Sequence, residues 1–88
     1  MVDKAYTIEF THRAEKVFRA LPPEIRRRLA PKIDALKLNP RPRGVKSLEG
    51  PEGILRMRVG DYRILYRILD DRVVVLLVKI GHRPEIYR

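Results

Sequence analysis

One stretch of the sequence, RMRVGDYRILYRI at Arg56–Ile68, constrains the fold more than any other part of the chain. Its pattern predicts a β-hairpin with Gly60 and Asp61 as a two-residue turn, so that Val59 pairs with Tyr62. Successive side chains of a strand point to opposite faces of a sheet, so this register sorts the hairpin into two sets. A slip of one residue on either strand would mix the sets, which favours this register.

The two sets differ sharply in chemistry. One is apolar apart from its tyrosines: Leu55, Met57, Val59, Tyr62, Ile64, Tyr66 and Ile68. The other holds Arg56, Arg58, Arg63, Leu65 and Arg67, and its side of the sheet is called the arginine face below. The apolar set must meet the core, so the arginine face is expected to be open to solvent.

Arginine opposite arginine needs a reason, because like charges across a hairpin are destabilising. Long side chains that extend into water would explain one or two of them. Four on one face, in a chain with a net charge of +9, favour an anion site instead. The net charge predicts attraction to a polyanion, which could be nucleic acid, an acidic protein or a membrane surface. The planar guanidinium suits bidentate recognition of phosphate.

The rest of the chain predicts an α+β domain over residues 1–88. Expected elements are a strand at Tyr6–Phe10, helices at His12–Ala20 and Pro23–Leu38, a loop at Asn39–Gly53, and strands at Ile54–Val59, Tyr62–Leu69 and Arg72–Ile80. Thr11 caps the first helix, Pro31 should kink the second, and Asp70 and Asp71 form a tight hairpin turn. We therefore expect a four-stranded sheet, an N-terminal strand with a three-stranded antiparallel meander, and both helices on one face.

Composition excludes several classes of protein. The chain has no cysteine, so a disulfide, a thiolate metal site and a thiol nucleophile are impossible. Its longest apolar run, Val73–Val78, is too short to span a bilayer, and the N-terminus lacks the apolar segment of a signal peptide. No His, Asp and Glu cluster has metal-ligand spacing, so neither a metal nor another cofactor is expected. These features predict a soluble, cytoplasmic protein without a membrane partner.

The last residues, GHRPEIYR, supply the candidates for acid–base chemistry. Gly81 is expected to end the final strand, and His82, Arg83 and Tyr87 follow it. Histidine titrates near neutrality, and a tyrosine among arginines ionises more readily than a free one. Each has an ordinary alternative, since His82 could be a surface turn residue and Tyr87 could cover the core.

The hairpin motif, R-x-R-x-G-D-Y-R-x-x-Y, and the later G-H-R-x-E-x-Y resemble the RelE/ParE toxin superfamily, in particular the RelE-type mRNA interferases. The likeness covers nearly the whole chain and includes VKSLEG before the hairpin. It implies a toxin that cuts translated mRNA in the ribosomal decoding site without a metal, and that a cognate antitoxin protein neutralises. The alternatives are a ParE-like inhibitor that binds gyrase without being an enzyme, and a plain nucleic-acid-binding module.

The resemblance also implies roles for particular residues. The residues that match family positions are Arg56, Arg58, Arg63, Arg83 and Tyr87, while His82 stands where other members have a different basic residue. Taken with the hairpin register, the candidate catalytic residues are Tyr87, His82, Arg83 and Arg63, and the candidate RNA- or phosphate-binding residues are Arg56, Arg58, Arg67 and Lys46. Tyr87 is the first choice of base and His82 the second. The chain departs from the family pattern in two ways: arginines replace lysines, which removes lysine as a base, and the segment between Arg83 and Tyr87 is shorter.

Overall fold

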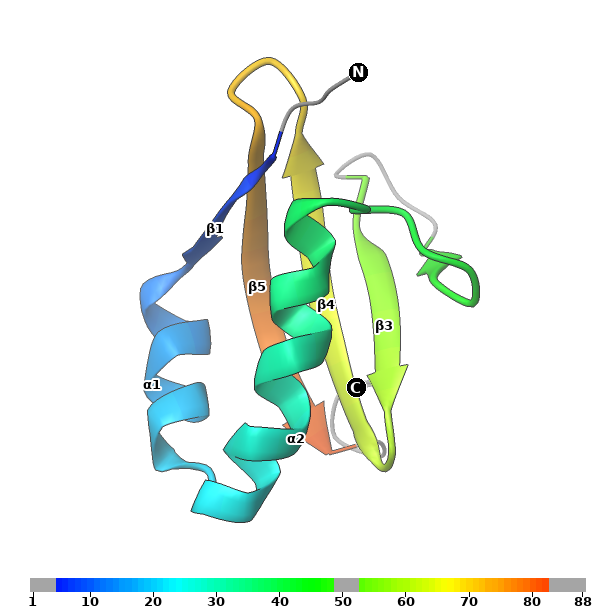
Figure 1. Cartoon of the computed structure of the whole chain (residues 1–88). Coiled ribbons are helices and arrows are strands. Elements are labelled where there is room, and N and C mark those ends of the chain that lie inside the picture. The colour runs from blue at the N-terminus through cyan, green and yellow to red at the C-terminus, as the bar shows by residue number, and fades with distance from the viewer. Residues whose placement is uncertain (1–4, 49–52, 83–88) are drawn as a thin grey trace.

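The structure, a computed structural model, describes residues 5–48 and 53–82. It is an α+β domain in which two helices cover one face of a five-stranded mixed sheet (Figure 1). The elements are β1 (Thr7–Phe10), α1 (His12–Ala20), α2 (Pro23–Asp34), the 3-10 helix η1 (Ala35–Lys37), β2 (Lys46–Ser47), β3 (Leu55–Val59), β4 (Tyr62–Leu69) and β5 (Val74–His82). No helix among these residues is long and apolar enough to cross a membrane.

The sheet differs from the expected one in two respects. Its order is β1-β5-β4-β3-β2, and β1 lies parallel to β5 while the other pairs are antiparallel. The fifth strand, β2, lies in the segment predicted to be a loop and pairs only with Leu55 and Arg56. A two-residue strand carries almost no alternation, so its sequence gives no periodic signal.

The arginine hairpin has the predicted register. Val59 pairs with Tyr62, and Arg58 lies directly opposite Arg63. Gly60 adopts a φ of 61°, a conformation that costs glycine little and other residues more. Because this register holds, the apolar set of the hairpin faces the helices and the arginines share the other face.

The core lies between the helices and the apolar side of the sheet. Its most deeply buried large side chains are Leu29 and Leu36 from the helical layer and Ile64, Tyr66, Val75 and Leu77 from the sheet. α1 begins where predicted, because the Thr11 side chain accepts a hydrogen bond from the Ala14 amide at 3.1 Å. α2 contains Pro31 and ends at Asp34, four residues before the predicted Leu38, with η1 following.

The turn between β4 and β5 is longer than predicted. Asp70–Val73 form it, so the expected tight turn of two aspartates and the strand start at Arg72 are wrong. Val73 has a φ of 55°, which is rare for a β-branched residue, and its carbonyl accepts the Thr7 amide at 2.9 Å. That bond joins the turn to β1, a contact that no local pattern could indicate.

A β-bulge divides β5 into two halves. Tyr66 pairs with Leu77 but Leu65 pairs with Lys79, which leaves Val78 as the additional residue. The bulge reverses the alternation, so Ile80 returns to the core and Lys79 joins the arginine face. Thr11 stabilises the bulge, because its hydroxyl donates to the Val78 carbonyl at 3.2 Å.

Candidate functional site

Strand pairing places six cations on the arginine face. They are Lys46 on β2, Arg56 and Arg58 on β3, Arg63 and Arg67 on β4, and Lys79 on β5. Among the described strand residues, Glu9 is the only acid with this orientation, and it lies on β1 at the far edge of the sheet. The positive charge is therefore concentrated on the β2, β3 and β4 side, as an anion site requires.

Arg63 is buried, which corrects the expectation that this face is uniformly open. Only 7% of its surface is accessible, and it is the only buried charged residue found in the described part of the chain. β4 is the central strand of the sheet, so Arg63 has a neighbour on either side, Arg58 on β3 and Gly81 on β5. The burial of Arg63 extends to its guanidinium, since the Nη1 atom is shielded from solvent, whereas Arg58 is exposed and can change its conformation.

The turn of the hairpin brings further cations together. The Arg58 Nε donates to the Gly60 carbonyl at 3.3 Å, which turns this side chain back over the turn. Arg28 of α2 approaches from the helical layer, since a Cβ added to Gly60 would lie 3.4 Å from its Nη1. This end of the sheet therefore carries positive charge on both faces.

His82 lies on the helix face, opposite the arginine face. Gly81 does not end β5 as predicted; the strand continues to His82, which pairs with Tyr62. The two rings are 4.6 Å apart, centroid to centroid, and nearly perpendicular at 86°. The sequence analysis expected His82 to follow the strand as part of a group near the arginines, and it did not predict the bulge that places Lys79 on the arginine face.

The other C-terminal candidates, Arg83 and Tyr87, lie outside the described residues. Within the described part, the cations Arg56, Arg58 and Arg63 are brought together on adjacent strands, with Lys46 beside Arg56. Arg67 shares their face, two strand positions beyond Leu65. No group of three or more His, Asp and Glu side chains in residues 5–48 and 53–82 could hold a metal ion.

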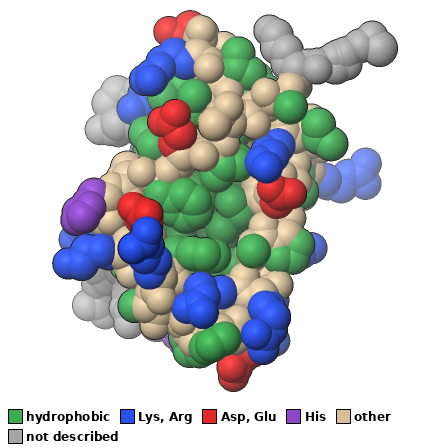
Figure 2. Space-filling model, turned by 60° about the vertical axis from the view of Figure 1, so that its left-hand side comes forward, with side chains coloured by type: hydrophobic (Ala, Val, Ile, Leu, Met, Phe, Trp, Pro, Cys, Tyr) green, Lys and Arg blue, Asp and Glu red, His purple; other side chains and the backbone are tan. Residues whose placement is uncertain are grey.

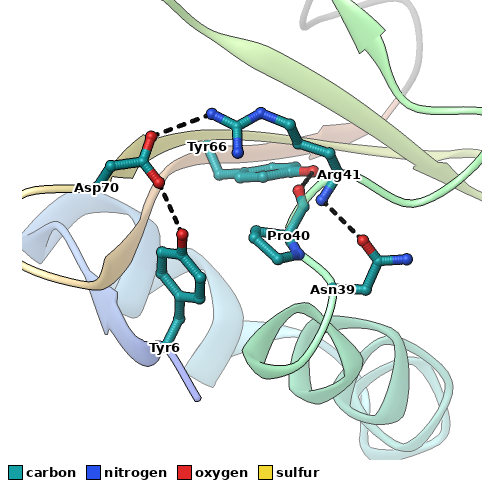
Figure 3. A network of polar contacts seen from close by, with 6 residues as sticks. All are labelled: Tyr6, Asn39, Pro40, Arg41, Tyr66 and Asp70. Carbon is teal, nitrogen blue, oxygen red and sulfur yellow. Dashed lines mark hydrogen bonds and ion pairs between the residues drawn. The ribbon is translucent and has the colours of Figure 1, made fainter. Parts of the chain in front are cut away.

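A polar network at the opposite end of the sheet anchors the loop after η1 (Figure 3). The buried Tyr66 hydroxyl donates to the Pro40 carbonyl at 2.7 Å. Asp70 accepts from the Tyr6 hydroxyl at 2.7 Å and pairs with Arg41 at 3.2 Å. Burial raises the pKa of Tyr66 to about 12, and the hydrogen bond to Asp70 raises the pKa of Tyr6. Sequence analysis missed this network because its members are far apart along the chain.

A hollow of about 580 Å³ is a different kind of surface. It lies among β1, α1 and α2, and its floor is apolar, with Ile8, Phe10 and Ile33 among the lining residues (Figure 2). Its charged residues, Asp34 and Lys37, are paired with each other at 2.9 Å. The hollow thus offers little excess charge to a polyanion, and the arginine face remains the candidate site.

Comparisons with known proteins show the family of the chain. Residues 8–87 match the family described as ParE toxin of type II toxin–antitoxin system, parDE. The chain is 31% identical to the mRNA interferase toxin RelE of Escherichia coli K12 over 94% of its own length and 90% of the relative's. It is 34% identical to the toxin RelG of Mycobacterium tuberculosis, with 94% and 97% covered. The toxin in the crystal structure of the intact E. coli RelBE toxin–antitoxin complex superposes with a TM-score of 0.79 at 30% identity, over 89% of this chain and 96% of that one.

Proposed function

This chain belongs to the family of ParE toxins of type II toxin–antitoxin systems, and from that premise we propose that it is an endoribonuclease of the RelE kind, which cleaves translated mRNA on the ribosome. The observation that carries the proposal is the arginine face. Directly paired strand residues have Cα atoms about 4.5–5.5 Å apart, so Arg58 and Arg63 can address one phosphate together.

The proposed reaction is transesterification. The 2′-hydroxyl of one nucleotide attacks its own 3′-phosphate, its proton passes to a base, and the bond from phosphorus to the 5′-oxygen breaks. The products are a 2′,3′-cyclic phosphate and a 5′-hydroxyl, with no metal required. Arg56, Arg58 and Arg63 stabilise the negative charge of the pentacovalent state, and the burial of Arg63 keeps one donor fixed in place.

Tyr87 is the proposed base, and Arg83 orients the phosphate or helps protonate the leaving 5′-oxygen. His82 ranks second because its ring packs against Tyr62 on the other face of the sheet. The ribosome would contribute by holding the mRNA in a reactive geometry.

A cognate antitoxin is the second proposed partner. Relatives of this fold have been solved as complexes of RelE with RelB. Because the chain carries a net charge of +9, a small acidic protein encoded in the neighbouring reading frame suits the role, and both would act in the cytoplasm.

Primer extension on mRNA, with and without ribosomes, tests the proposal. Purified chain should cut translated mRNA at codon-defined positions and leave ribosome-free mRNA intact. Arg58→Ala should lower the rate, while Arg13→Ala, an exposed arginine on α1, should not. Uncut mRNA together with inhibited gyrase would replace this proposal with the ParE-like alternative.

A further inference from the structure

A second cleft, of about 360 Å³, opens on the helix side of the sheet beside β3. We call it the basic cleft, because the cations Lys32, Arg43 and Arg58 line it and no described acidic residue does. Leu36, Val45 and Met57 contribute apolar surface. The ion pairs among the described residues involve none of the three cations, so their charge is available to a ligand.

The basic cleft is continuous with the arginine face through one residue. Among the described residues, β2 pairs with β3 only at Leu55 and Arg56, so no described strand pairs with this edge of β3 where Arg58 lies. Arg58 belongs to the arginine face by register, and the same residue is also part of the lining of the cleft. A strand of nucleic acid that crosses the arginine face at Arg58 can therefore continue round the edge into the cleft.

The wall formed by the loop is held in place. The Tyr66 hydroxyl binds the Pro40 carbonyl at 2.7 Å, and the Val45 amide donates to the Pro42 carbonyl at 3.3 Å. The lining residue Arg43 lies in the turn that the second bond closes, three residues after the anchored Pro40. A preformed cleft binds at a smaller cost in conformational entropy than a mobile loop would.

We propose that the basic cleft binds a nucleotide of the mRNA on the 3′ side of the cut, a subsite that rests on the function proposed above. The base would lie against Leu36, Val45 and Met57, and the phosphates would contact Lys32 and Arg43. The volume lies within the range of small-ligand sites, about 300–1,000 Å³. The 3′ side is favoured because the upstream codon is already base-paired to tRNA and cannot place a free base here.

The first test needs no ribosome. Binding of a fluorescent eight-nucleotide oligouridylate is compared among the parent chain, the double variant Lys32→Ala/Arg43→Ala, and the charge-matched control Arg13→Ala/Lys16→Ala on α1. All four residues are exposed, so both variants should keep the fold, which urea unfolding checks. Loss of charge-assisted contacts should weaken the cleft variant about tenfold or more, and the control much less. Equal losses in the two variants would overturn the subsite.

The second test identifies the strand that is bound. Non-cleavable mRNA, with a 2′-O-methyl group at the cut, is placed on ribosomes so that it either ends with the codon in the decoding site or extends beyond it. The parent should bind the extended mRNA more tightly, and Lys32→Ala/Arg43→Ala should bring the ratio of the two affinities close to one. The control should keep the parent's ratio. An unchanged ratio in the cleft variant would mean that the cleft does not take mRNA.

A third probe separates RNA from an acidic polypeptide. If binding of a decameric polyglutamate, but not of oligouridylate, depends on Lys32 and Arg43, the cleft is a protein site and the proposal is wrong. The proposed function can fail separately: a parent chain that binds oligouridylate through the cleft but never cuts translated mRNA would refute the nuclease and leave an RNA-binding cleft.

Discussion

Tyr66 provides the most quantitative test of the structure, because one hydroxyl links the core to the loop that lines the basic cleft. Tyr66→Phe removes the hydrogen bond to Pro40 and nothing else from a fully buried ring. Loss of such a bond costs about 0.5–1.5 kcal/mol, and the Pro40 carbonyl loses its partner as well. At pH 7 to 9 we expect the variant to be less stable than the parent by about 1–2 kcal/mol.

The difference should reverse at high pH. Burial raises the pKa of Tyr66 to about 12, whereas an unfolded tyrosine titrates near pH 10. A raised pKa in the folded state gives stability that is complete below about pH 10 and is lost as the pH rises towards 12. A difference of about two pKa units corresponds to about 2.7 kcal/mol, so the parent's advantage should vanish near pH 11 and become a deficit of about 1 kcal/mol by pH 12.

Urea unfolding of both proteins from pH 7 to 12 measures this difference directly, and comparison cancels the titration of lysines common to both. Tyr62→Phe, on the same strand and the same face, serves as the matched control for loss of a tyrosine hydroxyl. A difference in unfolding free energy between Tyr66→Phe and the parent that stays constant up to pH 12 would refute the argument that burial raises the pKa of this tyrosine.

The same variant should weaken oligouridylate binding, because Pro40 is an anchor of the loop beside the cleft.

Three further predictions concern the arginine face and the proposed base. Arg63→Ala should lower the rate of single-turnover cleavage about 10²–10³-fold, as expected for loss of a fixed donor to developing charge. It should also lower the free energy of unfolding by about 1–3 kcal/mol, because the side chain is buried. Cleavage at the parental rate would contradict the role of Arg63. Arg58→Ala should reduce the slope of log affinity for single-stranded RNA against log salt by about 0.7, and an unchanged slope would mean that Arg58 meets no phosphate. Tyr87→Phe should bind programmed ribosomes but not cleave, while His82→Gln loses less activity; the opposite ranking would exchange their roles.

The hairpin was predictable in detail because its signal is local. Alternation with a period of two, one apolar set and a glycine at the turn together permit a single register, and Arg58 does lie opposite Arg63. The first helix was predictable for a similar reason, since Thr11 and the apolar positions after it mark its start.

The features that escaped prediction all depend on contacts between distant segments. The alternation of side chains in β1 and β5 does not indicate that the two strands pair in parallel. The bulge at Val78 is stabilised by Thr11, which directly follows β1 and is far from Val78 along the chain. The burial of Arg63 also escaped prediction, because the alternation that placed it on the arginine face does not show how accessible each position of that face is. His82 was expected near the arginines and lies on the helix face, and Lys79 was assigned to neither face. Both residues follow the bulge, which determines the face on which each lies.

The pairing of β1 with β5 also determines when this protein can finish folding during its own synthesis. Thr11 and the Val78 carbonyl that it binds are 67 positions apart, and translation at about 5–20 residues per second separates them by about 3–13 s. Throughout that interval the first strand has no partner, and Lys79 has not joined the cations of the sheet. A ribosome that makes the chain should therefore meet a folded product only after nearly all of the chain has left its exit tunnel.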